Sequence, residues 1–173
     1  MPANIEIKAR VRDLPALKTR AESLSDTPVQ VIPQEDIFFV TLNGRLKLRI
    51  LAPDHAQLVW YERTDETGPR RSDYQIYETR DPEHLKNTLA MALGVRGVVK
   101  KTRYLYLADQ TRIHLDDVEG LGHFMELEVV MRQGQLDSEG QAIAEDFIKK
   151  LGIAPGDLLD TAYIDMLEKI NGK

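Results

Sequence analysis

The chain has 173 residues, a net charge of −5 and no cysteine, and each of these properties excludes a class of protein. The length suffices for one domain with a sizeable core. The acidic balance argues against a general nucleic-acid binder, which normally carries a basic excess. The lack of cysteine excludes disulfides, thiolate metal sites and cysteine nucleophiles. The chain shows neither a signal-peptide pattern nor an apolar run near the roughly 20 residues that span a bilayer, so we expect a cytoplasmic protein with no membrane segment.

The first half of the chain has the pattern of several strands and one helix. Asp13 and Pro15 are typical of a helix start, and Thr27-Pro28 ends the helix expected at residues 16–24. Asn43-Gly44 lies between two alternating apolar runs and is a strong hairpin signal. Strands are expected at residues 4–10, 45–51, 57–63 and 72–79, with a less regular extended segment at 29–41 that is interrupted near Pro33.

The second half continues with strands between helices. Asp81 and Gly94 are typical of the start and end of a helix at residues 82–93. Further strands are expected at 98–107, 112–117 and 123–132, and further helices at 138–151 and 155–170. No repeat or linker interrupts the chain, so we predict a single domain over residues 1–173. About eight strands in mostly hairpin order favour an α+β fold, with an antiparallel sheet curved or closed into a barrel and helices outside it.

Each predicted strand places its charged residues on one face, because successive side chains in a strand point to opposite faces. A half-solvated sheet is the simple explanation of this pattern. If the helices cover the apolar face, however, closing the sheet turns the charged face into a lumen, where charges must find partners. The residues on this face include Glu6, Lys8, Lys47, Arg49, Arg63, Lys101, Arg103, Arg112, His114, Asp116, Glu126 and Glu128.

A lumen with both bases and acids predicts a metal-bound polyphosphate. Lys and Arg match phosphate oxygens, whereas clustered carboxylates would repel them unless a divalent cation lay between. Oxygen ligands without cysteine fit Mg²⁺ or Mn²⁺. On this face His114 could touch phosphate, position a water molecule, or form a hydrogen bond with Asp116. The basic pair Arg70-Arg71 is expected in an exposed loop, and the alternative is that it closes over the mouth of the lumen.

The order and spacing of these residues resemble the CYTH superfamily, the triphosphate tunnel metalloenzymes. Its opening signature, Glu-x-Glu-x-Lys, has its counterpart in Asn4-Ile5-Glu6-Ile7-Lys8. The run from Arg112 to Asp116, Gly120-Leu121-Gly122, and the run from Phe124 to Glu128 are similar to the closing strands of the family. The tail from Ala162 to Leu167 is similar to its C-terminal helix. The resemblance covers essentially the whole chain.

The resemblance implies an eight-stranded antiparallel β-barrel whose tunnel binds triphosphate. It implies phosphate binding by Lys8, Lys47, Arg49, Arg63, Lys101, Arg103 and Arg112. It implies metal binding, of Mg²⁺ or Mn²⁺, by Glu6, Asp116, Glu126 and Glu128. We expect the catalytic group to consist of Glu6, Lys8, Arg63, Glu126 and Glu128. One departure is Asn4, a neutral residue where the signature has glutamate, and the presence of a second metal depends on it.

Members of this superfamily either cyclise ATP or hydrolyse triphosphates. The Asn-x-Glu-Ile-Lys-Ala-Arg start and the Leu-Asp-x-Val-x-x-Leu-Gly-x-Phe run resemble the class IV adenylate cyclases most, which implies conversion of ATP to cyclic AMP and pyrophosphate. A triphosphatase acting on thiamine triphosphate, inorganic triphosphate or a nucleoside triphosphate is the alternative. A catalytically weak polyphosphate or nucleotide binder is the third reading, and Asn4 favours it. A homodimer is left open.

Overall fold

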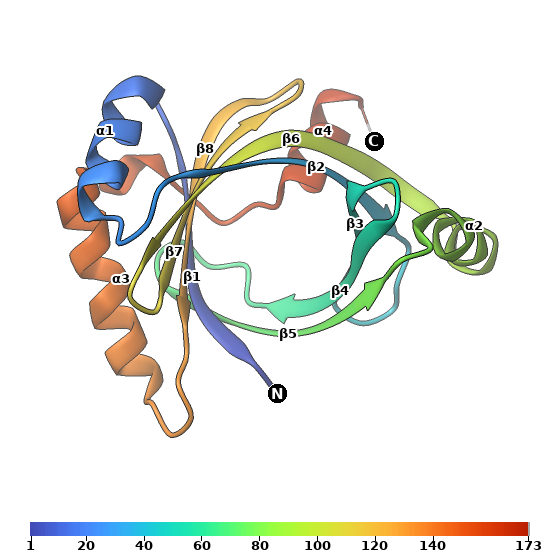
Figure 1. The fold of residues 1–173 in the computed structure, drawn as a ribbon, viewed down its shortest axis with the longest axis horizontal. Coiled ribbons are helices and arrows are strands. Elements are labelled where there is room, and N and C mark those ends of the chain that lie inside the picture. Colours follow the sequence, from blue (N-terminus) through green and yellow to red (C-terminus); the bar gives the residue numbers. More distant parts are fainter. Residues whose placement is uncertain (173) are drawn as a thin grey trace.

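A closed barrel of antiparallel strands forms the centre of the computed structural model, which describes residues 1–172 (Figure 1). The strands pair in the order β5-β4-β3-β2-β6-β7-β8-β1, and β1 pairs again with β5 to close the ring. This confirms the predicted eight-stranded barrel. The strands are β1 (Ala3–Arg10), β2 (Gln30–Phe39), β3 (Arg45–Ala52), β4 (His55–Arg63), β5 (Arg70–Thr79), β6 (Val95–Ala108), β7 (Thr111–Val118) and β8 (Gly122–Val130).

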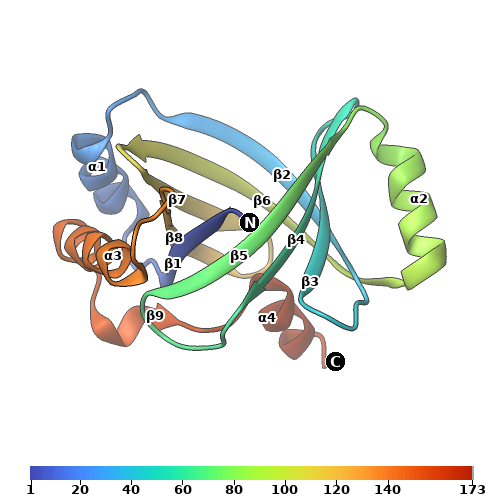
Figure 2. The same ribbon diagram turned by 90° about the horizontal axis from the view of Figure 1, so that it is seen from below.

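Four α-helices in the described residues lie outside this barrel, as predicted (Figure 2). They are α1 (Leu14–Leu24), α2 (Pro82–Leu93), α3 (Asp137–Leu151) and α4 (Tyr163–Ile170). The Asp13 side chain caps α1 by accepting a hydrogen bond of 3.0 Å from the backbone N–H of Ala16. Asp81 caps α2 in the same way, and Gly94 ends it at a φ of 80° that suits glycine. Local sequence signals therefore set these helix ends.

The apolar face of the barrel points outward and is covered by helices. Helices α1 and α3 lie together on one side, where residues such as Ile5, Ile113 and Leu127 form the largest core (Figure 1). Helix α2 lies on the opposite side and packs against a smaller cluster that contains Phe39 and Leu48. Because side chains alternate along each strand, the charged residues between these apolar ones must point into the barrel.

Strand β2 runs without a break through Pro33, where the sequence pattern predicted an interruption. Pro33 has no N–H to donate, so it is tolerated only where a strand lacks a partner on that side. Strand β3 begins to pair with β2 only at Glu35, while the pairing of β2 with β6 extends back to Gln30. Pro33 therefore lies in a part of β2 that has a neighbour on one side only.

The C-terminal segment corrects another expectation, a single helix over residues 155–170. A 3₁₀ turn (Pro155–Asp157) is followed by the two-residue strand β9 (Leu158–Leu159), and α4 begins only at Tyr163. Strand β9 pairs with Lys8 and Ala9 of β1, which draws the chain across one end of the barrel. Extended backbone is needed to make this crossing.

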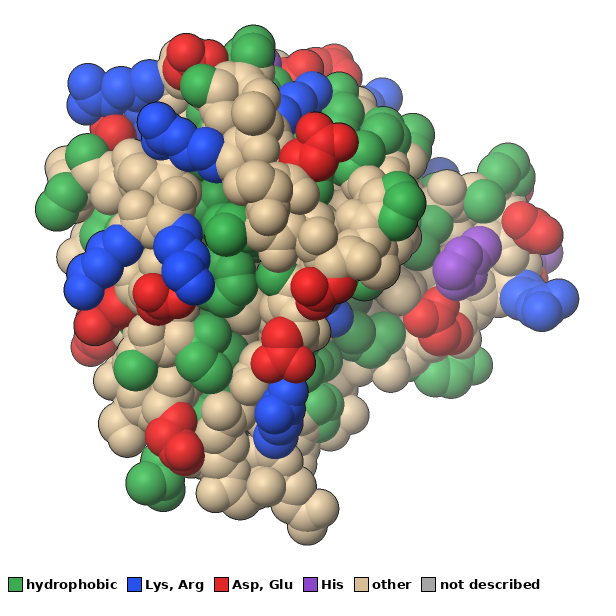
Figure 3. Space-filling view, turned by 60° about the vertical axis from the view of Figure 1, so that its left-hand side comes forward, with side chains coloured by type: hydrophobic (Ala, Val, Ile, Leu, Met, Phe, Trp, Pro, Cys, Tyr) green, Lys and Arg blue, Asp and Glu red, His purple; other side chains and the backbone are tan. Residues whose placement is uncertain are grey.

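The outer surface shows mixed charge on the face that carries α1 and α3. Acidic and basic side chains are interspersed there, and α2 projects from the side of the body (Figure 3). Ion pairs on this surface include Arg71 with Asp137 at 2.7 Å and Arg132 with Asp109 at 2.9 Å. Among residues 1–172, no helix combines the length and the apolar character needed to cross a bilayer.

Candidate functional site in the barrel lumen

The barrel encloses a cavity of about 270 Å³ that is lined mainly by polar and charged side chains. This volume is close to the lower end of the range typical of small-molecule sites. Every strand of the ring contributes inward-pointing residues to the cavity, as the alternation of side chains requires. The charged residues that line it are Glu6, Lys8, Asp36, Lys47, Arg49, Arg63, Arg70, Lys101, Arg103, Arg112, Glu126 and Glu128.

Three glutamates lie together on the adjacent strands β1 and β8. Glu6 stands directly opposite Glu128 in the antiparallel register, and Glu126 stands opposite Lys8. Burial, and next the negative charges of Glu128 and Glu126, raise the pKa of Glu6 to about 7. A carboxylate that resists ionisation in this way gains most from a cation placed beside it. Asn4, the next inward residue of β1, is 3% exposed and its Oδ1 has no hydrogen-bond partner among the described residues.

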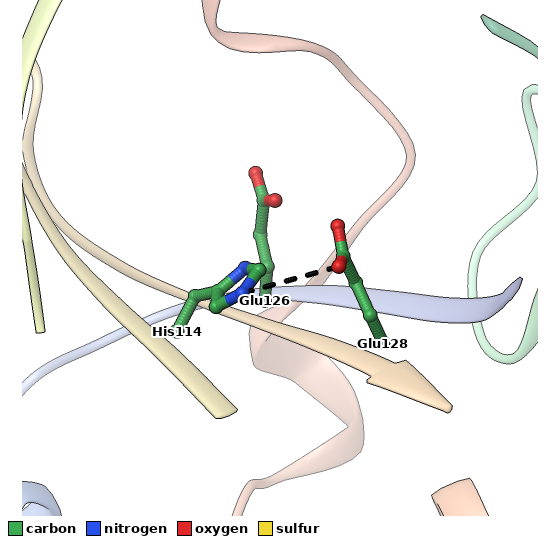
Figure 4. Close-up of side chains that lie close together, drawn as sticks. All are labelled: His114, Glu126 and Glu128. Atoms are coloured by element: carbon green, nitrogen blue, oxygen red, sulfur yellow. Dashed lines mark ion pairs between the residues drawn. The ribbon is translucent and has the colours of Figure 1, made fainter. Parts of the chain in front are cut away.

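His114 completes a cluster with two of these glutamates (Figure 4). One potential ligand atom from each of His114, Glu126 and Glu128 lies within 4.8 Å of the other two. The Nε2 of His114 is 3.9 Å from the Oε2 of Glu128. Burial, followed by the positive charge of Arg103, lowers the pKa of His114 to about 3, so the imidazole is neutral near pH 7. Two carboxylates and a neutral imidazole are a donor set that fits a divalent cation.

Lys47 and Arg49 share one buried carboxylate, that of Asp36 on the neighbouring strand. Arg49 donates two hydrogen bonds of 2.8 Å to Asp36, and the Nζ of Lys47 lies 3.0 Å from it. Burial alone would raise the pKa of Asp36, but Arg49 and Lys47 hold this pKa well below its usual range. Burial also lowers the pKa of Lys47 to about 8. Asp36 thus holds the side chains of Lys47 and Arg49 in place where they line the lumen.

Asp116 has the same role for a second basic pair and does not join the metal cluster that was predicted for it. Its carboxylate accepts hydrogen bonds from Arg103 at 2.8 and 2.7 Å, from Lys101 at 3.2 Å and from the hydroxyl of Tyr163 at 3.0 Å. It is 0% exposed, and these donors occupy its oxygens. Burial opposes ionisation, yet Arg103 and Lys101 hold the pKa of Asp116 well below its usual range. Asp116 therefore fixes the positions of the Lys101 and Arg103 side chains.

Two arginines of the lumen form no ion pair within the described residues. The Nε of Arg63 has no hydrogen-bond partner, and Arg70 leaves its Nε and one Nη without partners. Arg70 was expected in an exposed loop, but it lies in β5 opposite Glu6 and is only 3% exposed. Its other Nη reaches the backbone oxygens of Glu66 and Leu159. An anion in the cavity would find these guanidinium groups free to donate.

The floor of the cavity is formed where the C-terminal segment enters α4. Ala162 and Tyr163 line this end, and the ring of Tyr163 packs against Phe124 with a centroid distance of 5.1 Å. The Nζ of Lys8 lies 3.9 Å from the centroid of the Tyr163 ring and donates a hydrogen bond of 3.2 Å to the backbone oxygen of Thr161. Burial lowers the pKa of Lys8 to about 8, although Glu126 lies 3.3 Å away.

Ten of the eleven residues predicted from the sequence line the cavity, and the eleventh, Asp116, lies behind it. The cluster found in the structure contains Glu126 and Glu128, while Glu6 lies beside it. Arg112 is 2.9 Å from Glu128. Sequence reasoning missed Asp36, and it assigned no place in the site to Arg70 in β5 or to Tyr163. The alternation that identified the other strands also extends to Asp36 and Phe38 in β2, and this signal could have found Asp36.

Comparison with known proteins agrees with the fold. The family model described as the CYTH domain matches residues 2–163. A protein of Methanocaldococcus jannaschii, named as a proposed adenylate cyclase, is 24% identical over 173 residues, which cover 94% of this chain and 97% of that protein. The PH1012 structure from Pyrococcus horikoshii has a TM-score of 0.83 at 26% identity, over 94% of this chain and 98% of its own. A Hippeastrum protein, titled as a proposed adenylyl cyclase with dominant triphosphatase activity, has a TM-score of 0.67 at 16% identity, over 100% and 97% of the two chains.

Proposed function

Because this chain belongs to the CYTH domain family, we propose that its lumen binds a triphosphate and that the protein is a divalent-metal-dependent enzyme, with a class IV adenylate cyclase-like reaction as the first candidate. One observation carries the proposal: a cluster of two glutamates and a histidine shares a single cavity with arginines that have N–H groups without a partner among residues 1–172. Such a cavity has groups for both a cation and a polyanion.

The basic residues fit the separate phosphates of one extended chain. Arg63 and Arg70 have free donors, and Arg guanidinium groups bind phosphate oxygens in pairs. The bases that pair with Asp36 and Asp116 also line the cavity. The residues that we propose for phosphate binding are Lys8, Lys47, Arg49, Arg63, Arg70, Lys101, Arg103 and Arg112.

The acidic residues would hold the cation. We propose Glu126 and Glu128 as ligands, with Glu6 beside them. A bound divalent cation would supply positive charge to phosphate oxygens and to a leaving polyphosphate. The protein's own bases share that task, because catalysis of phosphoryl and nucleotidyl transfer depends mainly on positioning and on stabilising negative charge.

The opposite end of the cavity favours a triphosphate with an organic group. Ile32, Leu105, Tyr74 and Ile76 all line the cavity. The directions of β2, β5 and β6 place these residues toward the end away from Tyr163. An apolar rim with one aromatic ring would contact a nucleobase, whereas bare triphosphate would gain nothing from it.

In the cyclase reaction the ribose 3′-oxygen of ATP attacks the α-phosphorus. The bond from the α-phosphorus to the bridging oxygen breaks, pyrophosphate leaves with that oxygen, and the 3′-hydroxyl loses its proton. Glu6 is our candidate to accept this proton, because its carboxyl group lines the cavity beside Glu128 without belonging to the proposed ligand set. Arg63 and Lys8 would stabilise the charge that develops on the phosphates.

Hydrolysis by a triphosphatase is the second candidate, since the same cradle would hold a triphosphate for attack by water on the terminal phosphorus. The activity stated for the Hippeastrum protein is the reason to keep this candidate. The two reactions differ in the atom that attacks and in the products.

Product identification tests the proposal. Purified protein with ATP and Mn²⁺ or Mg²⁺ should give cyclic AMP and pyrophosphate, separated by chromatography. ADP and phosphate would instead establish a triphosphatase, and binding of ATP, thiamine triphosphate and inorganic triphosphate without turnover would establish a binding protein. Glu126→Gln and Glu128→Gln should abolish metal-dependent turnover, while Glu62→Gln, at an exposed position of β4, is the matched control.

A further inference from the structure

The buried imidazole of His114 has no structural partner that accounts for its position. His114 is 4% exposed, and its Nδ1 makes no hydrogen bond with any described residue. Leaving a buried polar nitrogen unpaired is energetically costly, so such groups normally have a partner or a function. Asp116, the acceptor that the sequence suggested, is already bonded to Lys101, Arg103 and Tyr163. The ring is therefore not held by the hydrogen bond that a purely structural histidine would make.

The ring lies instead beside the carboxylates of the lumen (Figure 4). Strand β7 pairs with β8 so that His114 stands directly opposite Glu126, and its Nε2 lies 3.9 Å from Glu128. One potential ligand atom from each of the three residues lies within 4.8 Å of the other two. The imidazole thus offers a nitrogen to the same point that the two glutamates offer oxygen.

The surroundings of the two carboxylates weaken their attraction for a hard cation. Glu126 already faces Lys8 and Arg103, each at 3.3 Å, and Glu128 faces Arg112 at 2.9 Å. On β1, Glu6 stands opposite Glu128, and the next inward position holds neutral Asn4 rather than a further acid. These basic neighbours offset much of the negative charge of Glu126 and Glu128. A nitrogen donor therefore contributes a larger share of the free energy of cation binding than it would beside unpaired carboxylates.

We propose that His114 is a nitrogen ligand of the divalent cation held by Glu126 and Glu128, and that it makes this site select Mn²⁺ over Mg²⁺. Mg²⁺ strongly prefers oxygen ligands in a strict octahedron and gives up its water reluctantly. Imidazole suits first-row transition metals better than Mg²⁺, and Mn²⁺ is the first-row metal that also suits carboxylate and water ligands. This inference rests on the proposed function only in placing a divalent cation in the lumen.

The test measures cation binding without any triphosphate. Isothermal titration calorimetry with Mn²⁺ or Mg²⁺ should show that His114→Gln weakens Mn²⁺ binding at least tenfold and changes Mg²⁺ binding less than threefold. His123→Gln is the control, because His123 lies in β8 with its side chain 44% exposed and 3.6 Å from Asp117. Equal Mn²⁺ affinity in wild type and His114→Gln would overturn the proposal, as would failure of the wild type to bind Mn²⁺.

A spectroscopic measurement keeps the test valid if the variant does not fold. Electron spin-echo envelope modulation of Mn²⁺ bound to the wild-type protein should show coupling to an imidazole nitrogen, which ¹⁵N labelling of histidine would alter. The coupling should disappear in His114→Gln or His114→Asn. Its absence from the wild-type spectrum would refute the proposal even if ATP is turned over, whereas nitrogen coupling without turnover of any triphosphate would refute only the proposed function.

Discussion

Replacing Glu6 by glutamine should stabilise the cation-free protein, and the gain should depend on pH. The carboxyl group of Glu6 is buried and faces Glu128 and Glu126, which together raise its pKa from the usual 4.5 to about 7. A raised carboxyl pKa means that the folded protein holds a proton that the unfolded chain has lost. Stability is therefore lost as the pH rises from about 4.5 to about 7, and the full cost applies above pH 7.

The size of the effect follows from the same numbers. Each pKa unit corresponds to 1.36 kcal/mol, so a rise from 4.5 to about 7 costs the wild type about 3 kcal/mol at pH 8. At pH 5 the cost is below about 1 kcal/mol, because the unfolded carboxyl group is then only partly ionised. Glutamine cannot ionise, so Glu6→Gln removes this cost. Groups that do not interact with Glu6 titrate identically in both proteins and cancel in the difference, whereas Glu126 and Glu128 lose a repulsive neighbour in the variant.

Urea unfolding of wild type and Glu6→Gln in EDTA, at pH 5 and pH 8, measures this difference. The variant should exceed the wild type by about 3 kcal/mol at pH 8 and by much less at pH 5. Glu62→Gln, at an exposed position, should change stability by less than about 0.5 kcal/mol at either pH. Mn²⁺ should stabilise the wild type and narrow the gap. A gap that is the same at both pH values would refute the reasoning.

Three further perturbations probe the basic side of the lumen. Asp36→Asn should lower the free energy of unfolding by about 3 kcal/mol in urea titrations, because Lys47 and Arg49 would then face each other uncompensated; an unchanged midpoint would contradict the pairing. Arg63→Met should weaken binding of inorganic triphosphate at least tenfold by calorimetry and leave the Tm nearly unchanged, since Arg63 has no ion pair to lose among residues 1–172; equal affinity would remove it from the site. Triphosphate affinity should fall at least about tenfold from pH 8 to pH 9, because Lys8 and Lys47 have pKa values of about 8 and lose their charge in this range; a flat profile would exclude them as ligands.

Sequence reasoning found most of the barrel because a strand has a period of two residues. Alternation alone places Lys47 and Arg49, or Glu126 and Glu128, on one face, and closure of the sheet then brings those faces together. It could not supply the partner of each charge, because the register between strands is a tertiary property. Asp36 illustrates this limit, since it lies opposite Arg49 only when β2 and β3 are aligned.

The remaining errors came from segments where no periodic signal operates. Arg70 follows Thr67-Gly68-Pro69 and looks like part of a turn, yet pairing with β1 draws it into β5. Tyr163 lies after a stretch with helical character, and only the pairing of Leu158 and Leu159 with β1 directs it to the floor of the lumen. For His114, the sequence could show which face of the strand carries the side chain. It could not show that the Nδ1 of the ring has no hydrogen-bond partner among the described residues.

The floor formed by Ala162 and Tyr163 has a kinetic consequence. With this end covered, a triphosphate bound as proposed would enter and leave the lumen past the residues Leu105 and Tyr74 of its lining. An organic product at the rim would have to leave before an inorganic product bound deeper among the basic residues. Release would then be ordered, with pyrophosphate or phosphate last. Inorganic product would therefore compete with the incoming triphosphate for the empty protein, whereas the organic product would bind only to protein that still retains the inorganic one.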